Sequence, residues 1–99
     1  MARFRVSKAA AADIREIGRY TQQRWGRAQR RTYLDGLNAQ FQRLADSPAL
    51  APARADFDPP VRIFPYQRHL IVYMQERHET ILVVRVLHQR MNVPAQLTR

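Results

Sequence analysis

The sequence predicts an α+β domain with the element order β-α-α-β-β-β, in which a helical hairpin packs on one face of a small antiparallel sheet. Apolar residues recur at three- and four-residue spacings over the first half of the chain, as in amphipathic helices. Runs rich in β-branched residues fill the last third, as in strands. Helical and strand patterns that stay apart along the chain are typical of α+β proteins. A length of 99 residues suits one domain, which we place at 1–99.

The first predicted elements are a short strand and a helix. Basic and apolar residues alternate over residues 3–6, which predicts a strand at a sheet edge. Ser7 can accept a hydrogen bond at the N-terminus of a helix over residues 9–25, and Gly26 can end that helix. The apolar stripe of this helix consists of Ile14, Ile17, Thr21 and Trp25, and we expect Ile14, Ile17 and Trp25 to pack in the core.

A second helix is predicted over residues 27–45. The connection after residue 25 is so short that the two helices must form an antiparallel hairpin. Gly36 lies in the middle of the second helix, where glycine costs about 1 kcal/mol relative to alanine, so we expect close packing there. The apolar stripe of this helix consists of Tyr33, Leu34, Leu37, Phe41, Leu44 and Ala45.

The rest of the chain predicts a loop, three strands and a short tail. Residues 46–60 are rich in proline and have no periodicity, so we expect a loop. A short strand over residues 61–64 is closed by Pro65. Residues 68–75 are apolar on both alternations, which predicts a central strand, and residues 80–88 predict another. One face of that last strand should carry Leu82, Val84, Val86 and His88, and the other Ile81, Val83, Arg85 and Leu87. The tail contains Met91, Val93 and Leu97, enough for one short docking turn.

The charge balance points to a polyanionic partner. The chain carries 17 Lys and Arg against 8 Asp and Glu, a net charge of +9, and all but one of the basic residues are arginine. Nucleic acid and an acidic protein both fit this balance. With no cysteine, disulfides, thiolate zinc sites and cysteine nucleophiles are excluded. No apolar run approaches the length of a membrane span or a signal peptide, so we expect a cytoplasmic location and no membrane partner.

One candidate site groups His69, Arg85, His88 and Arg90, with Arg62 and Arg68 near them in sequence. A general base, a general acid and several cations could cleave RNA without a metal. The alternative is structural: Arg85 would be a half-buried sheet arginine with a carboxylate partner, and His88 would cap a strand end. His69, His78 and His88 match no metal-ligand spacing, and no nucleotide-binding loop is present, so we expect no metal and no cofactor.

A second candidate site lies on the helical hairpin. Residues 15–31 contain six arginines against one glutamate, together with Tyr20 and Trp25. A basic hairpin tip with a tryptophan can act as a hot spot for an acidic helix or strand. The alternative is a solvated helix face, with Trp25 in the core. The arginines are Arg15, Arg19, Arg24, Arg27, Arg30 and Arg31.

Two segments resemble the ParE toxins of type II toxin–antitoxin systems. The first is Tyr20-Thr21-x-x-x-Trp25-Gly26-x-x-Gln29 on the hairpin. The second is the end of the last strand, Val84-Arg85-Val86-Leu87-His88-Gln89-Arg90-Met91-Asn92. The resemblance covers residues 4–97 in the family's order. It implies a fold shared with the RelE ribonucleases, a role in plasmid or chromosomal toxin–antitoxin modules, poisoning of DNA gyrase, and a hetero-oligomer with an acidic, ParD-like antitoxin.

The resemblance also suggests which residues act. We expect no catalytic residue, and we expect the antitoxin on the hairpin at Arg15, Arg19, Tyr20, Arg24, Trp25 and Arg27. The gyrase-binding candidates are Arg85, His88, Arg90, Met91 and Asn92. The alternative is a ribosome-dependent mRNA endoribonuclease of the RelE type that uses Arg85 and His88, although such enzymes commonly place a tyrosine near the C-terminus and this chain has none after Tyr73. A basic nucleic-acid-binding module is a third reading, supported by charge alone.

Overall fold

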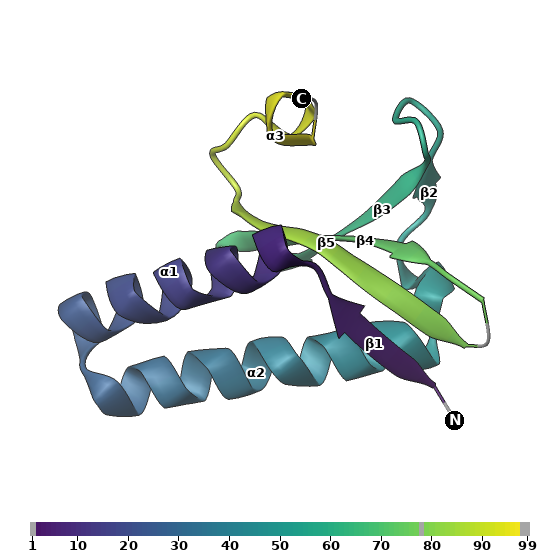
Figure 1. The fold of residues 1–99 in the computed structure, drawn as a ribbon. Helices are drawn as coiled ribbons and strands as arrows, with labels where there is room; N and C mark the ends of the chain where they lie inside the picture. The colour runs from purple at the N-terminus through teal and green to yellow at the C-terminus, as the bar shows by residue number, and fades with distance from the viewer. Residues whose placement is uncertain (1, 78, 98–99) are drawn as a thin grey trace.

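The computed structural model describes residues 2–77 and 79–97, in which a helical hairpin covers one face of a five-stranded sheet (Figure 1). The strand order across the sheet is β1-β5-β4-β3-β2. The predicted α+β class, with the hairpin on the sheet, is confirmed. The elements are β1 (Arg3–Val6), α1 (Lys8–Trp25), α2 (Arg27–Asp46), η1 (Pro48–Leu50), β2 (Ala53–Arg54), β3 (Val61–Tyr66), β4 (His69–Gln75), β5 (Thr80–His88) and α3 (Val93–Leu97).

The hairpin begins and turns where the sequence predicts. The Ser7 hydroxyl accepts a hydrogen bond from the Ala10 amide at 2.9 Å, which caps the N-terminus of α1. Gly26 has a φ of +94°, a conformation that side-chain-bearing residues rarely adopt, and its amide donates to the Gln22 carbonyl at 2.9 Å. This one residue joins α1 to α2, so the two helices run antiparallel (Figure 1).

The main core lies between the hairpin and the sheet. The expected stripe of α2 is confirmed, since Leu37, Phe41, Leu44 and Ala45 are buried and Tyr33 and Leu34 pack against them. The expected place of Trp25 in the core is wrong, because its side chain is 67% exposed. The tip of the hairpin projects beyond the edge of the sheet, so the end of α1 lies away from the strands (Figure 1). The sheet contributes Ile71, Tyr73, Ile81, Val83 and Val86 to this core.

Three features of the sheet edges differ from the sequence prediction. β1 pairs with β5 in parallel, with Arg3 opposite Thr80, so the sheet is antiparallel everywhere except at this pair. The chain between these strands is long enough for a crossover, and a four-residue pattern carries no strand direction. The predicted loop also contains the two-residue strand β2. β3 continues through Pro65, which is tolerated because β2 pairs only with Val61 and Arg62 and leaves that edge open.

A bulge in β5 corrects the predicted faces of the last strand. Val72 lies opposite Arg85 but Tyr73 lies opposite Val83, so Val84 is an extra residue on β5. One extra residue reverses the alternation of every side chain beyond it. Val86 therefore joins Ile81 and Val83 in the core under the hairpin. Val84 and Leu87 belong to a smaller apolar cluster on the opposite face.

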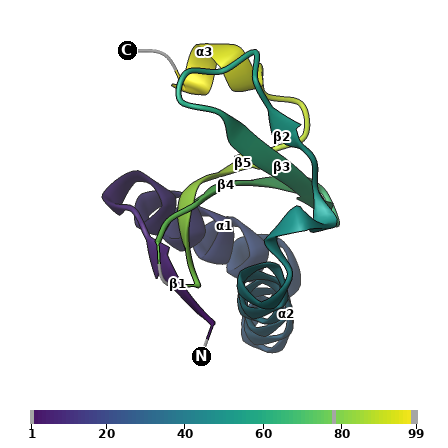
Figure 2. The same ribbon diagram turned by 90° about the vertical axis from the view of Figure 1, so that its right-hand side faces the viewer.

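The short helix α3 packs against this smaller cluster, on the face of the sheet opposite the hairpin (Figure 2). Val93 and Leu97 contact it, which confirms the predicted docking turn of the tail. The buried residues of the cluster are Val61, Val72 and Leu87. None of the helices in the described part of the chain is both long and apolar enough to cross a membrane.

Candidate functional site

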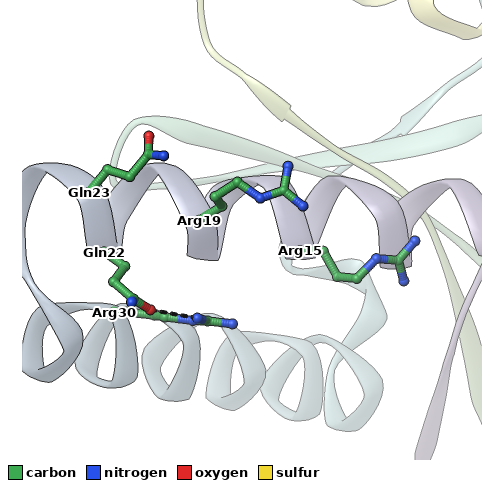
Figure 3. Close-up of a pocket in the computed structure, with 5 residues that line it drawn as sticks. All are labelled: Arg15, Arg19, Gln22, Gln23 and Arg30. Atoms are coloured by element: carbon green, nitrogen blue, oxygen red, sulfur yellow. Dashed lines mark hydrogen bonds between the residues drawn. The ribbon is translucent and has the colours of Figure 1, made fainter.

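A shallow groove lies on the outer side of the hairpin (Figure 3). It has a volume of about 310 Å³, and its lining is basic and polar: Arg15, Arg19, Gln22, Gln23 and Arg30. Residues four positions apart share one face of a helix, so α1 presents Arg15 and Arg19 together. Gln22 on α1 and Arg30 on α2 point toward each other and are joined by a hydrogen bond of 2.7 Å (Figure 3). Arg19 also donates to the Glu16 carboxylate at 2.6 Å in an exposed pair.

The tip of the hairpin exposes two aromatic rings beside an arginine. Tyr20 is 56% exposed and Trp25 is 67% exposed. The guanidinium carbon of Arg24 lies 5.6 Å from the Tyr20 ring centroid and 5.9 Å from the Trp25 ring centroid. Cation–π contact with both rings holds these three side chains together on the surface. Exposed tryptophan, tyrosine and arginine are the residue types most often found at binding hot spots.

Arg85 is held entirely by groups of its own chain. Its Nε and one terminal nitrogen donate to the two carboxylate oxygens of Asp13, at 2.8 and 2.9 Å. Its other terminal nitrogen donates to the Gln96 carbonyl at 3.2 Å. The Asp13 carboxylate also accepts the Val86 amide at 2.9 Å. The hydrogen bond to Asp13 raises the pKa of Arg85 further above its usual range. The structural alternative for Arg85, a half-buried sheet arginine with a carboxylate partner, is confirmed.

His69 and His88 face each other across β4 and β5, with ring centroids 5.5 Å apart. The Tyr33 hydroxyl lies 2.5 Å from Nδ1 of His69. Burial, helped by the neighbouring His88, lowers the pKa of His69 to about 4, and burial raises the pKa of Tyr33 to about 12. At neutral pH the tyrosine therefore donates and the neutral imidazole accepts. Nδ1 of His88 accepts the Arg90 amide at 3.1 Å, which caps the end of β5 as the sequence suggested.

The structure divides the predicted histidine and arginine cluster. His69 and His88 meet, but Arg85 reaches α1 instead. Arg62 lies toward the other end of the sheet, where it donates to the Ala51 carbonyl and to the Gln75 amide oxygen. His78 lies outside the described residues. Among the residues that the structure describes, no three His, Asp or Glu side chains gather as a metal site would require.

The chain is similar to known toxins over nearly its whole length. A family model described as the ParE toxin of the type II toxin–antitoxin system parDE matches residues 4–93. The chain belongs to the ParE toxin family. It is 38% identical over 95 residues to Toxin ParE1 of Mycobacterium tuberculosis, covering 96% of this chain and 97% of that one. It is 32% identical over 97 residues to Toxin ParE of Escherichia coli, covering 98% and 94%.

The fold is also that of a solved member of a ParDE system. A chain in a structure described as the chromosomal ParDE toxin–antitoxin system from P. aeruginosa superposes with a TM-score of 0.72. The match covers 89% of this chain and 96% of that chain, at 17% sequence identity. The resemblance seen in the hairpin and in the final strand is thereby confirmed as ParE membership.

In this ParE-family chain, the hairpin candidates and the C-terminal candidates occupy separate places. All the hairpin candidates, namely Arg15, Arg19, Tyr20, Arg24, Trp25 and Arg27, are exposed. Arg90, Met91 and Asn92 are exposed in the turn that follows β5, next to the half-buried His88. Arg85 lies apart from this turn.

Two residues with a clear structural role were not singled out from the sequence. Asp13 precedes Ile14 on the inward side of α1, and an acidic residue there is a signal for a buried cation. Tyr33 was assigned only to the apolar stripe, although a buried tyrosine hydroxyl usually finds a hydrogen-bond partner.

Proposed function

We propose that this chain is the toxin of a toxin–antitoxin pair, that it poisons DNA gyrase in the cytoplasm without catalysing a reaction, and that a ParD-like antitoxin neutralises it in a hetero-oligomer. Membership of the ParE family carries this proposal. The surface of the molecule supports it further, because its two exposed candidate regions are suited to binding other proteins.

The hairpin is the proposed antitoxin-binding surface. The whole chain has a net charge of +9, and the groove on the hairpin is lined by Arg15, Arg19 and Arg30, so this surface suits an acidic segment. Arginine pairs with carboxylates through two parallel hydrogen bonds, which gives orientation as well as attraction. Tyr20 and Trp25 at the tip supply exposed apolar area that an antitoxin would cover. The charges would speed association, and the aromatic tip would contribute most to affinity.

The turn after β5 is the proposed gyrase-binding segment. Arg90 and Asn92 offer hydrogen-bond donors, and Met91, which is 47% exposed, offers an adaptable apolar contact. His88 fixes the start of this turn, because its ring accepts the Arg90 amide and its carbonyl accepts the Met91 amide. A preorganised turn of this kind binds a protein partner with a smaller entropic cost than a free tail.

Three features weigh against the RelE-type nuclease. Three of the five N–H donors of Arg85 already bond within the chain, and the pair with Asp13 offsets its charge, so this guanidinium is poorly placed to stabilise a phosphorane. A histidine with a pKa of about 4 is a weak base at neutral pH. Tyr33, with a pKa of about 12, is a weak acid there. The proposed binding surfaces, the hairpin and the turn after β5, do not require any of these groups to transfer a proton.

Induction in growing cells tests the proposal. A gyrase poison should cause the SOS response and filamentation. His88→Gln should leave growth arrest largely intact, because the glutamine side-chain oxygen can still accept the Arg90 amide that fixes the turn. Under the nuclease alternative, translation stops abruptly with cleaved mRNA, and His88→Gln should reduce cleavage on the order of 10²-fold or more. A thermal melt of the variant must come first, to show that it folds. Cleavage of ribosome-bound mRNA by the purified protein, lost with His88→Gln, would refute the gyrase proposal.

A further inference from the structure

The C-terminal segment is attached to the body of the protein at two separated points. At its start, the Arg90 and Met91 amides bond to His88 at the end of β5. At its end, α3 rests on the sheet through Val93 and Leu97, and the Gln96 carbonyl accepts a hydrogen bond from Arg85. The exposed turn with Met91 and Asn92 lies between these two attachments. Its shape therefore depends on both of them.

α3 cannot hold itself in place. It has five residues, far fewer than the roughly 12–15 that an isolated helix needs to be even marginally stable in water. Its two apolar anchors are only partly buried. Its position therefore has to come from contacts with the rest of the protein, and Arg85 donates a side-chain hydrogen bond to the Gln96 carbonyl of α3 at 3.2 Å.

Arg85 can reach α3 because Asp13 orients it. The two oxygens of the Asp13 carboxylate bind Nε and one terminal nitrogen of the guanidinium, which fixes the plane of this group. Asp13 is fixed in turn by the Val86 amide at 2.9 Å, beyond the point where β1 stops pairing with β5. One chain of contacts thus runs from α1 through β5 to α3. The ion pair is mostly shielded from water, with side-chain exposures of 22% for Arg85 and 15% for Asp13.

We propose that Asp13 and Arg85 are positioning residues of the toxin, which dock α3 against the sheet and thereby present residues 88–92 as a fixed turn to the target. The part that concerns the target rests on the proposed gyrase function. The docking part does not depend on it. Neither residue touches the partner in this proposal. Loss of the docking frees one end of the turn, so binding must then order it again at an entropic cost.

Arg85→Lys is the most direct test, because it keeps the charge but not the geometry. A lysine ammonium is a compact donor and cannot span both Asp13 oxygens and the Gln96 carbonyl as the planar guanidinium does. Asp13 keeps its bond to the Val86 amide in this variant, so the sheet should stay intact. Asp13→Asn is a second variant, which weakens the same ion pair by removing the negative charge that holds the Arg85 guanidinium. Arg54→Lys is the matched control, since Arg54 pairs with Asp56 on the surface.

Hydrogen exchange of the full-length protein reads the docking directly. We expect Arg85→Lys and Asp13→Asn to speed exchange of the Gln96 amide, which donates to the Asn92 carbonyl at 3.2 Å within residues 93–97, by about tenfold or more, while amides of Ile71, Val72 and Tyr73 keep their protection. Arg54→Lys should change neither. Unchanged exchange of the Gln96 amide would overturn the proposal. Equal acceleration in β4 would also overturn it, because Arg85 would then stabilise the whole fold.

Binding to purified gyrase measures how the docking of α3 affects recognition of the target. Arg85→Lys should weaken binding to purified gyrase on the order of tenfold. Leu97→Ala, which removes an apolar anchor of α3, should do the same, and the double variant should be little worse than either single variant, because both act through one docking event. Additive losses would show that Arg85 acts elsewhere, against the proposal. If the unmodified protein does not bind gyrase, the proposed function fails while the exchange result still decides the docking.

Discussion

Gly36 shows how one missing side chain sets the contact between α2 and the sheet. A Cβ placed at this position would overlap the hydroxyl of Tyr66, at the end of β3. We predict that Gly36→Ala destabilises the fold by roughly 1–3 kcal/mol through overpacking, although alanine is the better helix former by about 1 kcal/mol. Chemical denaturation of the two proteins measures the difference.

Tyr66→Phe supplies the matched background for this test. Removing the hydroxyl removes the atom that the new Cβ would meet first. Gly36→Ala should therefore cost clearly less in a Tyr66→Phe protein than in the unmodified one. An equal cost in both backgrounds would show that the close approach to Tyr66 is not the reason for this glycine.

His69 should make the stability of the protein fall in mild acid. Its pKa is about 4 when folded and 6.5 in the unfolded reference, so the unfolded chain binds more protons between these values. The contribution of neutral His69 to the free energy of unfolding is complete above pH 6.5 and is lost as the pH falls toward 4. Burial is the main cause and the nearby His88 adds to it, while Asp13 opposes it. Allowing for partial exposure of the ring, we expect a loss of about 1–2 kcal/mol.

His69→Gln separates this effect from other groups that titrate in acid. Glutamine keeps an acceptor for the Tyr33 hydroxyl but does not titrate. Exposed carboxylates such as Glu76, whose pKa is lowered by its hydrogen bond to Arg5, titrate equally in both proteins. Unfolding free energies measured from pH 7 to pH 4 should therefore fall more steeply for the unmodified protein than for the variant. Parallel curves would refute the role given to His69.

Side-chain partnerships were the hardest feature to obtain from the sequence. The carboxylate partner of Arg85 was expected as a class, but Asp13 was not named, since the two residues are 72 positions apart. Pairs this distant depend on how α1 lies across β5, which no local pattern encodes. The joining of His69 with His88 follows from strand register, whereas the use of Tyr33 as their neighbour follows from helix placement. Residue types were therefore easier to predict than contacts.

The hairpin offers a direct contrast between two aromatic residues that were both expected in the core. Phe41 is 2% exposed and packs edge-on against Phe4, whereas Trp25 is 67% exposed at the tip. We predict that Phe41→Ala costs roughly 3–5 kcal/mol of stability, by loss of burial and creation of a cavity. Trp25→Ala should stay within about 0.5 kcal/mol, as for most surface substitutions.

Thermal or denaturant unfolding of both variants tests this contrast, and binding to the antitoxin completes it. A near-zero cost for Phe41→Ala would mean that the wrong stripe of α2 had been assigned. A large cost for Trp25→Ala would mean that the tip is packed in solution. In the proposed antitoxin complex the order should reverse, with Trp25→Ala giving the clear loss of affinity.

Regular elements were predictable because each one is encoded locally. The amphipathic periods of α1 and α2, the Ser7 cap and the Gly26 turn lie within a few residues of the features they specify. The β5 bulge at Val84 and the parallel pairing of β1 do not, since both are settled by register against distant strands. β2 was missed because two exposed residues carry no pattern. The positions of the longer strands could thus be predicted, whereas the direction of β1 and the faces of β5 beyond the bulge could not.

Charge is distributed unevenly over the surface of the molecule, and we expect this distribution to orient an approaching partner. The arginine-lined groove lies on the hairpin, while a second groove at the opposite end of the sheet is bordered by Asp46 and Glu76. Surface charges of this kind steer a partner more than they add to its final affinity. The family could be predicted from the sequence because the hairpin and last-strand segments carry its motifs. The α+β order could be predicted because the helical and strand spacings of apolar residues occur in separate parts of the chain. The sequence also placed the arginines of residues 15–31 on the hairpin, whereas the groove that Arg15, Arg19 and Arg30 line required the fold.

Charge reversal on the hairpin tests this steering. Each Arg→Glu change removes one positive charge and adds one negative charge, so Arg15→Glu with Arg19→Glu takes the net charge from +9 to +5. Arg54→Glu with Arg77→Glu makes the same change away from the hairpin and serves as the control. We predict that the hairpin pair slows association with an acidic antitoxin on the order of tenfold at low salt, and the control pair far less.

The salt dependence of this effect decides its origin. Because exposed charges are screened over about 10 Å at 0.1 M salt and about 3 Å at 1 M, the difference between the two double variants should shrink as salt is added. The dissociation rate constant should change less than the association rate constant, since Tyr20 and Trp25 at the tip are unchanged. Stopped-flow association rates over a salt series measure both quantities. Equal slowing by the two pairs would mean that net charge alone matters, and no slowing by either would mean that the basic face of the hairpin serves another partner.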